Sequence, residues 1–175
     1  MGKRWVWVIA IGLVLLGGAL NSAAGVTFDL TKLKSVCVLV EDLTPESAQE
    51  LGLSKEAIRK YVYIWLKGKL PRLVVEQHTG AYTGACKRTA PSLWVKVLLR
   101  IGKTTDGRKT RYYGMVLINL ERRTRWENGN LGKGVAYFEG SILTGPIQNA
   151  ARGVNGGLDY ALTDFAAEYY KAGNP

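Results

Sequence analysis

Two acidic residues and the single histidine are the side chains of this sequence best suited to catalysis. Glu41 and Asp42 follow an apolar run over residues 36–40, and His78 lies in a stretch rich in glycine and threonine. A hydrolase could use one of these carboxylates together with His78 as acid and base. Neighbouring residues of a strand point to opposite faces, however, so the two carboxylates do not converge on their own. We therefore expect no enzymatic activity, and a hydrolase is the weaker alternative.

No other group of reactive side chains has the spacing of a familiar site. No serine lies in a Gly-x-Ser-x-Gly turn, and the glycine-rich residues 129–134 lack the consecutive Lys-Ser or Lys-Thr pair of a phosphate loop. One histidine and two distant cysteines do not make a set of metal ligands. We expect neither a metal nor a cofactor.

The remaining chemical signal is a run of basic residues with aromatic neighbours. Between Lys96 and Arg125 nine basic residues stand against two acidic ones, which gives this segment a charge of +7. Arginine beside an aromatic ring can bind carboxylates, phosphates or sugar acids through paired hydrogen bonds and stacking. The alternative is that these charges only keep an exposed hairpin soluble and unpaired at its edge. The candidate binding residues are Trp94, Arg100, Tyr113, Arg123 and Arg125.

The first residues have the pattern of an export signal. Two basic residues precede the apolar run 5–16, and the small residues Ser22 and Ala24 occupy the −3 and −1 positions of a cleavage site. The sequence thus predicts a cleaved signal over residues 1–24 and one mature domain over residues 25–175, periplasmic or secreted. The alternative is an uncleaved anchor, which is the one route by which the sequence predicts membrane contact.

Two cysteines, Cys37 and Cys86, remain after cleavage. An exported chain meets oxidising conditions, so the two can form a disulfide that closes a loop of about 50 residues and contributes about 4 kcal/mol. Cys37 lies within an apolar strand, however, where a thiol also packs well as a small hydrophobic group. Both readings stay open at this point.

The apolar patterns predict a two-layer α/β sandwich, an α+β arrangement with a mixed sheet of four or five strands. A strand, a helix and a second strand form a β-α-β start with parallel strands. A central antiparallel hairpin and a long C-terminal helix follow. The expected strands lie at 36–40, 72–77, 93–101, 112–120 and, at an edge, 135–143; the expected helices run from Thr44 to Leu51, from Ser54 to Gly68 and from Pro146 to Lys171.

The hairpin has a register that the sequence itself specifies. Asp106-Gly107 is a tight-turn signal, and pairing Ile101 with Tyr112 brings the apolar residues of both strands onto one face. The same register points an apolar stripe outward together with the candidate binding residues. We expect the first two helices to cover that stripe, which consists of Leu98, Met115 and Leu117.

Several segments resemble a group of uncharacterised bacterial exported proteins. They are "VCVLVEDLTPESAQELGLSKEAI", "PSLWVKVLL", "TRWENG" and the final "LDYALTDFAAEYYKAGNP". The order of elements is also similar to the amino-terminal domain of TolB and to lipoprotein activators of penicillin-binding proteins. This resemblance implies a domain that binds other envelope proteins and is not an enzyme. No cysteine lies at the predicted cleavage point, which departs from the lipoproteins and places lipid anchoring in doubt.

These observations favour an exported envelope domain that binds another envelope component, most simply a protein. Without the two basic residues of the signal, the chain has 22 basic against 14 acidic residues, a charge of +8. This charge favours the second hypothesis, a binder of anionic surface polymers such as lipopolysaccharide, teichoic acid or nucleic acid. Export makes nucleic acid the least favoured of the three.

Overall fold

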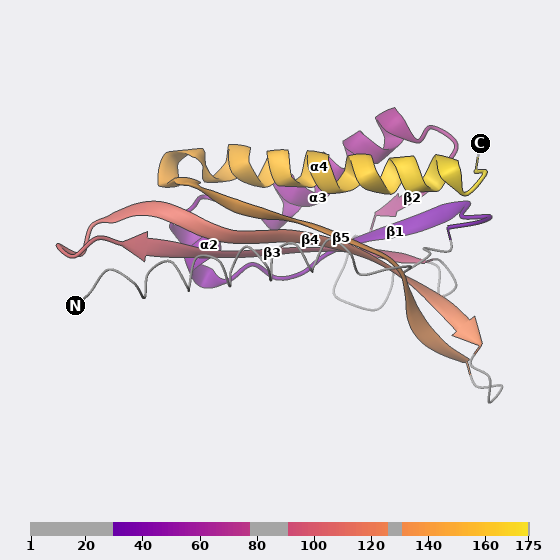
Figure 1. The fold of residues 1–175 in the computed structure, drawn as a ribbon, viewed down its shortest axis with the longest axis horizontal. Helices are drawn as coiled ribbons and strands as arrows, with labels where there is room; N and C mark the ends of the chain where they lie inside the picture. Colours follow the sequence, from indigo (N-terminus) through magenta and orange to yellow (C-terminus); the bar gives the residue numbers. More distant parts are fainter. Residues whose placement is uncertain (1–29, 78–90, 126–130, 175) are drawn as a thin grey trace, which may run out of the picture.

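The computed structural model describes residues 30–77, 91–125 and 131–174, which form one five-stranded sheet with helices packed on it (Figure 1). The strand order is β2-β1-β3-β4-β5; β1 is parallel to both of its neighbours, and β3, β4 and β5 are antiparallel. The expected mixed-sheet α/β architecture is confirmed. The elements are β1 (Ser35–Val40), α2 (Pro45–Gln49), α3 (Lys55–Lys69), β2 (Val74–Gln77), β3 (Ser92–Lys103), β4 (Lys109–Arg125), β5 (Leu131–Pro146), the 3-10 helix η1 (Ile147–Asn149) and α4 (Ala150–Lys171).

Side-chain caps begin the first two helices at the expected residues. Thr44 accepts a hydrogen bond from the Ser47 N–H at the start of α2, and Ser54 accepts one from Ala57 at the start of α3, both at 3.2 Å. The expected end of α3 at Gly68 is wrong. The helix continues to Lys69, because the Leu70 N–H still donates to the Leu66 carbonyl at 2.7 Å and both leucines are buried.

The central hairpin has the register that the sequence predicts. Ile101 pairs with Tyr112, and the match continues to Val95 opposite Ile118. Gly107 forms the turn with φ +80°, a conformation that glycine adopts without a steric penalty, and its N–H donates to the Thr104 carbonyl at 2.9 Å.

Strand β5 is longer than the expected edge strand over residues 135–143. It has 16 residues and pairs with β4 from Arg111 opposite Pro146 to Arg125 opposite Leu131. Glycines reduce its intrinsic preference for a strand, whereas the long partner strand supplies hydrogen bonds along its whole length. Since Pro146 belongs to β5, α4 begins four residues later than expected, at Ala150.

The core lies between the sheet and helices α3 and α4, which cover the same face (Figure 1). The other face of β3, β4 and β5 has no helix over it in the described part of the chain. The expectation that the first helices cover the outward stripe is therefore wrong. Helix α3 buries Ile58, Val62 and Leu66 in the core, and α2 lies beside the edge of β3, where Ser47 donates to the Leu99 carbonyl at 3.4 Å. Within the described ranges, no helix combines the length and the apolar character that a membrane span needs.

Candidate functional site on the outer sheet face

We define the outer face as the surface of β3, β4 and β5 that lies opposite α3 and α4. Residues that pair directly across antiparallel strands share a face, so the register assigns its members. These residues form four rows across the three strands. In order from the middle of the sheet toward the Gly107 turn, the rows are Trp94–Asn119–Phe138, Lys96–Leu117–Gly140, Leu98–Met115–Ile142 and Arg100–Tyr113–Thr144.

The third row is an exposed apolar strip across three strands. Ile142 is 86% exposed, and its neighbours Met115 and Leu98 are 37% and 39% exposed. Tyr113 on the next row and Phe138 two rows away on the other side are about half exposed. Directly paired residues on one face have Cβ atoms about 4.5–5.5 Å apart, so these side chains form a continuous surface. Contiguous apolar surface of this kind marks an interaction site more often than scattered single residues do.

Two arginines flank Tyr113 at the end of the strip. Arg100 pairs directly with Tyr113, and Arg111 pairs with Gly102 one row farther along. The Tyr113 ring leans over Gly102, where a Cβ atom would lie 3.7 Å from it. Both arginines are exposed, and neither makes an ion pair with a described residue. Their guanidinium groups therefore have donors available for a carboxylate or a phosphate.

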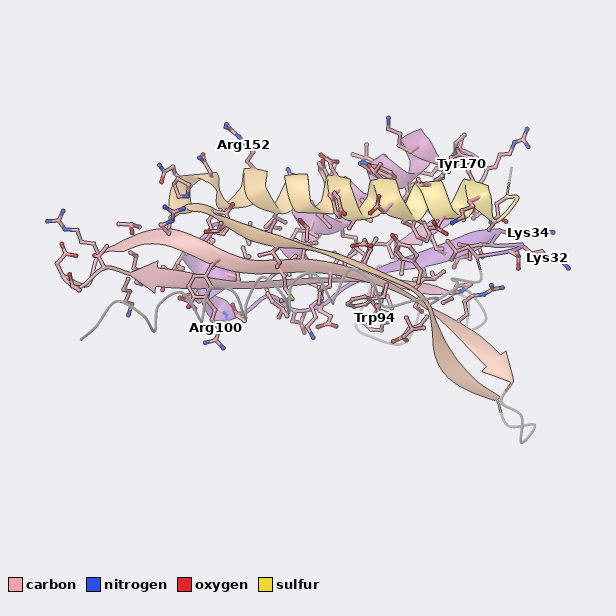
Figure 2. The ribbon with its side chains drawn as sticks, viewed as in Figure 1. Lys32, Lys34, Trp94, Arg100, Arg152 and Tyr170 are labelled. Atoms are coloured by element: carbon pink, nitrogen blue, oxygen red, sulfur yellow. The ribbon has the colours of Figure 1, made fainter. Side chains whose placement is uncertain are left out.

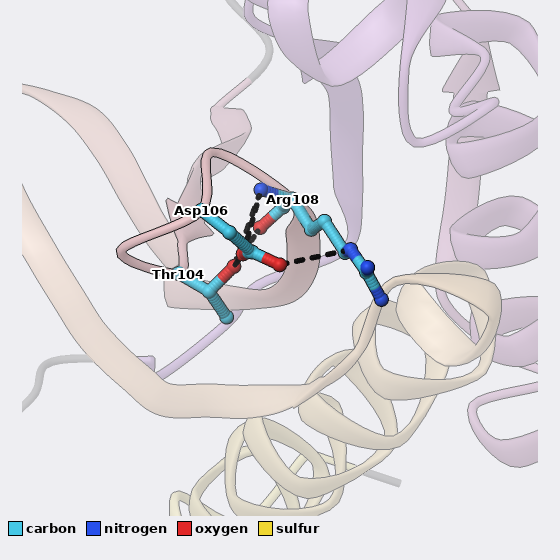
Figure 3. Close-up of polar contacts among 3 residues, drawn as sticks. All are labelled: Thr104, Asp106 and Arg108. Carbon is cyan, nitrogen blue, oxygen red and sulfur yellow. Dashed lines mark hydrogen bonds and ion pairs between the residues drawn. The ribbon is translucent and has the colours of Figure 1, made fainter.

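Other basic residues between Lys96 and Arg125 already form ion pairs with carboxylates of this chain. In the turn, the Arg108 guanidinium lies 2.9 Å from the Asp106 carboxylate (Figure 3). The Thr104 hydroxyl donates to that carboxylate and, with the Arg108 backbone N–H, lowers the pKa of Asp106, so this carboxylate stays ionised to a lower pH than an ordinary aspartate. Two further ion pairs join this segment to the rest of the chain, Lys96 with Glu41 at 3.0 Å and Lys109 with Glu50.

Trp94 belongs to the outer face but not to the arginine end. It is six residues from Arg100 along β3, a separation of about 20 Å in a strand, and Figure 2 shows the two well apart along the sheet. Its side chain is partly buried, and the indole Nε1 is buried without a hydrogen-bond partner among the described residues. Arg123 and Arg125 continue β4 opposite Lys133 and Leu131, but their side chains lie outside the described part of the structure. Their role, like that of the whole candidate set, stays a prediction.

The structure places the candidate catalytic carboxylates in separate ion pairs. Glu41 pairs with Lys96 on the outer face, whereas Asp42 pairs with Lys55 at the start of α3. His78 lies outside the described residues, so its place in the hydrolase hypothesis is untested. Within the described ranges no three His, Cys, Asp or Glu side chains are grouped as a metal site would require.

Cys37 is the one cysteine within the described ranges. It is fully buried in β1 and is not a free thiol. Cys86 lies outside the described residues, so the pairing of the two stays a prediction.

The sequence reasoning missed three contributors to the outer face. Phe138 and Ile142 come from β5. Arg111 is the third residue of β4, close to the Gly107 turn. A signal for the first two was present, because residues 135–143 place Phe138 and Ile142 in phase with the outer residues of β4 once β5 is paired with it. The strand over residues 135–143 was expected, but no register against β4 was derived for it, because Gly140 interrupts its alternating pattern.

Comparison with known proteins leaves this chain without a family. No family model matches it, and no curated protein matches it. A minor lipoprotein from Acinetobacter baumannii matches with a TM-score of 0.37 at 9% identity, over 79% of this chain and 92% of the lipoprotein. The rare lipoprotein B from Shewanella oneidensis matches with a TM-score of 0.22 at 10% identity, over 79% of this chain and 87% of that one. At these scores neither structure assigns a fold or an activity, and the resemblance to TolB and the penicillin-binding-protein activators stays an expectation.

Proposed function

We propose that this chain is an exported, non-enzymatic envelope domain that binds another envelope protein through its outer sheet face. The observation that carries the proposal is the exposed apolar strip of Leu98, Met115 and Ile142, which no helix of the described structure covers. The export pattern of residues 1–24 supports an envelope location.

The composition of this face favours a protein partner. Burial of an exposed apolar side chain stabilises an interface by about 25 cal/mol per Å² of apolar area removed from water. Arginine and tyrosine are the residue types that most often carry binding energy in protein interfaces, and Arg100 and Tyr113 lie side by side at the end of the strip. The partner that fits has an apolar ridge with a carboxylate at the end that meets Arg100 and Arg111.

The test is a crosslinking pull-down from native envelope extract at low and high salt. A wild-type bait should capture a discrete protein that survives high salt, and Ile142→Glu should abolish that capture. Ile64→Glu is the matched control, because Ile64 is also exposed, at 57%, but lies on α3 at the opposite side of the sheet. If both variants still capture the partner, or if both lose it equally, the assignment of the face is refuted. Charge reversal at Arg123 and Arg125 tests the remaining predicted contacts in the same assay.

A second candidate, a binder of anionic surface polymers, is supported by the two arginines that lack ion pairs in the described structure. Counterion release predicts that affinity for such a polymer falls steeply with salt. Replacement of Arg100 and Arg111 by glutamine should reduce the slope of log affinity against log salt by about two. A slope that is flat in the wild-type protein would exclude this function.

A further inference from the structure

A second surface, far from the arginine end of the outer face, lies where β1 and β2 begin. Because these strands are parallel and Ser35 pairs with Val74, the segments that lead into them lie side by side at one end of the sheet. The Val74 N–H donates to the Lys34 carbonyl at 3.0 Å and joins the two segments directly. Both segments have the same composition, with leucines and basic residues interleaved: "LTKLK" over residues 30–34 and "KLPRL" over residues 69–73.

The leucines fix these segments to the core. Leu30, Leu33, Leu70 and Leu73 are each at most 2% exposed. Each segment also contains a tight turn, in which the second leucine donates its N–H to the carbonyl of the first at 3.0–3.2 Å. The C-terminal segment also holds the first of these segments in place, because the Asn174 amide donates a hydrogen bond to the Leu30 carbonyl at 2.6 Å. The basic side chains between the leucines are thus held outward on an ordered backbone.

We define the basic end as Lys32, Lys34, Lys69 and Arg72. All four side chains are exposed, and none makes an ion pair with a residue in the described ranges. Figure 2 shows Lys32 and Lys34 at the tip of the molecule, beside the C-terminal end of α4. A fifth cation reaches this end, since Arg122 donates to the Thr31 carbonyl at 3.5 Å.

Apolar and aromatic groups lie among these cations. Val74 is 56% exposed and follows Arg72 by two residues. Tyr170 is 49% exposed, and its hydroxyl donates to the Lys69 carbonyl at 2.7 Å. Lysine and arginine with an exposed tyrosine and a small apolar side chain are typical of surfaces that meet lipid head groups.

We propose that the basic end rests on the surface of an anionic lipid bilayer. The path of the chain favours lipid over other anions. The described chain begins at Leu30, within this end, and the 13 residues 17–29 separate it from the apolar run 5–16, a span of at most about 50 Å. While that run is in a bilayer, during export or as a retained anchor, its tether joins the domain at the basic end. From the sequence alone, membrane contact was expected only through an uncleaved signal, and this surface adds a contact of the folded domain itself.

The geometry gives the contact a defined orientation. With the basic end on the lipid, the strands lead away from the membrane, and Arg100 lies toward the opposite end of the molecule (Figure 2). The proposal rests on residues that the proposed protein-binding face does not include, so each can fail without the other.

The test is cosedimentation of the purified, exported protein with phosphatidylcholine vesicles made with and without phosphatidylglycerol. The readout is the difference between the two vesicle types, because a retained apolar run would bind both. We expect the combined replacement of Lys32, Lys34, Lys69 and Arg72 by glutamine to weaken the phosphatidylglycerol-dependent partitioning at least about tenfold. The matched control carries the same charge change elsewhere on the surface: Lys60, Lys103, Arg108 and Arg152 to glutamine.

The control should retain most of the lipid-dependent binding. Equal losses in the two variants would show that only net charge matters and would overturn the proposal, as would a wild-type protein indifferent to phosphatidylglycerol. Binding of single-stranded DNA at the same salt concentration with no preference for vesicles would overturn it in favour of a soluble polyanion. A urea unfolding midpoint for each variant ensures that folded proteins are compared.

Discussion

The hydroxyl of Tyr112 occupies the space that a side chain at Gly153 would need. A Cβ atom at Gly153 would lie 1.8 Å from that oxygen, far inside van der Waals contact. Tyr112 is only 3% exposed in β4, and Gly153 lies in the second turn of α4. The absence of a side chain at this position therefore allows α4 to lie close against the sheet.

Gly153→Ala should destabilise the protein despite the better helix propensity of alanine. We expect the overlap with Tyr112 to cost more than the helix gains, for a net loss of about 1–3 kcal/mol in the free energy of unfolding. Gly156→Ala is the matched control: no atom lies within 4 Å of its Cβ position, so it should stabilise by up to about 1 kcal/mol. Urea denaturation of both variants measures the difference, and Tyr112→Phe combined with Gly153→Ala should recover part of the loss. A stabilising Gly153→Ala would contradict this account.

The central hairpin and the starts of α2 and α3 could be predicted because their signals are local. Alternating apolar residues on two strands and one tight turn permit a single register, and the structure has Val97 opposite Val116 as that register requires. Thr44 and Ser54 begin their helices through hydrogen bonds to residues three positions away, which a short stretch of sequence can reveal.

The uncovered outer face could not be predicted because it depends on tertiary packing. The stripe of Ile58, Val62 and Leu66 shows that α3 has an apolar side, but it does not show which face of the sheet that side covers. Strand β5 was underestimated for a related reason. Its hydrogen bonds come from β4, a partner that local propensity does not include, so Phe138 and Ile142 were missed as members of the site.

The same substitution should cost much more stability on the inner face of the sheet than on the outer face. Ile118 is fully buried against the helices, whereas Ile142 is 86% exposed on the outer face. Ile118→Ala should lower the free energy of unfolding by about 2–5 kcal/mol, because it leaves a cavity in the core. Ile142→Ala should change it by less than about 0.5 kcal/mol. Thermal or urea unfolding of both variants measures these changes. A large loss of stability in Ile142→Ala would mean that the outer face is covered within the protein.

Alkaline pH should weaken the contact between α3 and α4. The Tyr61 hydroxyl donates to the Asp159 carboxylate at 2.7 Å, and partial burial together with that carboxylate raises the pKa of Tyr61 to about 12. The unfolded chain loses this proton near pH 10, so the contribution is complete below pH 10 and declines as the pH rises from about 10 to about 12. Unfolding free energies measured across that interval should fall less steeply for Tyr61→Phe than for the wild type. Identical slopes would show that this pair does not contribute.

Reduction should destabilise the exported protein if Cys37 and Cys86 are paired as the sequence predicts. Cys37 is fully buried and not a free thiol, and a bridge to Cys86 would tie β1 to a position about 50 residues farther along the chain. The chain-entropy estimate for such a loop is about 4 kcal/mol, which should be lost when reductant is added before urea unfolding. A Cys37→Ala, Cys86→Ala variant should unfold like the reduced protein and be insensitive to reductant. Thiol titration in denaturant provides the decisive count, because two free thiols in the untreated protein would exclude the bridge.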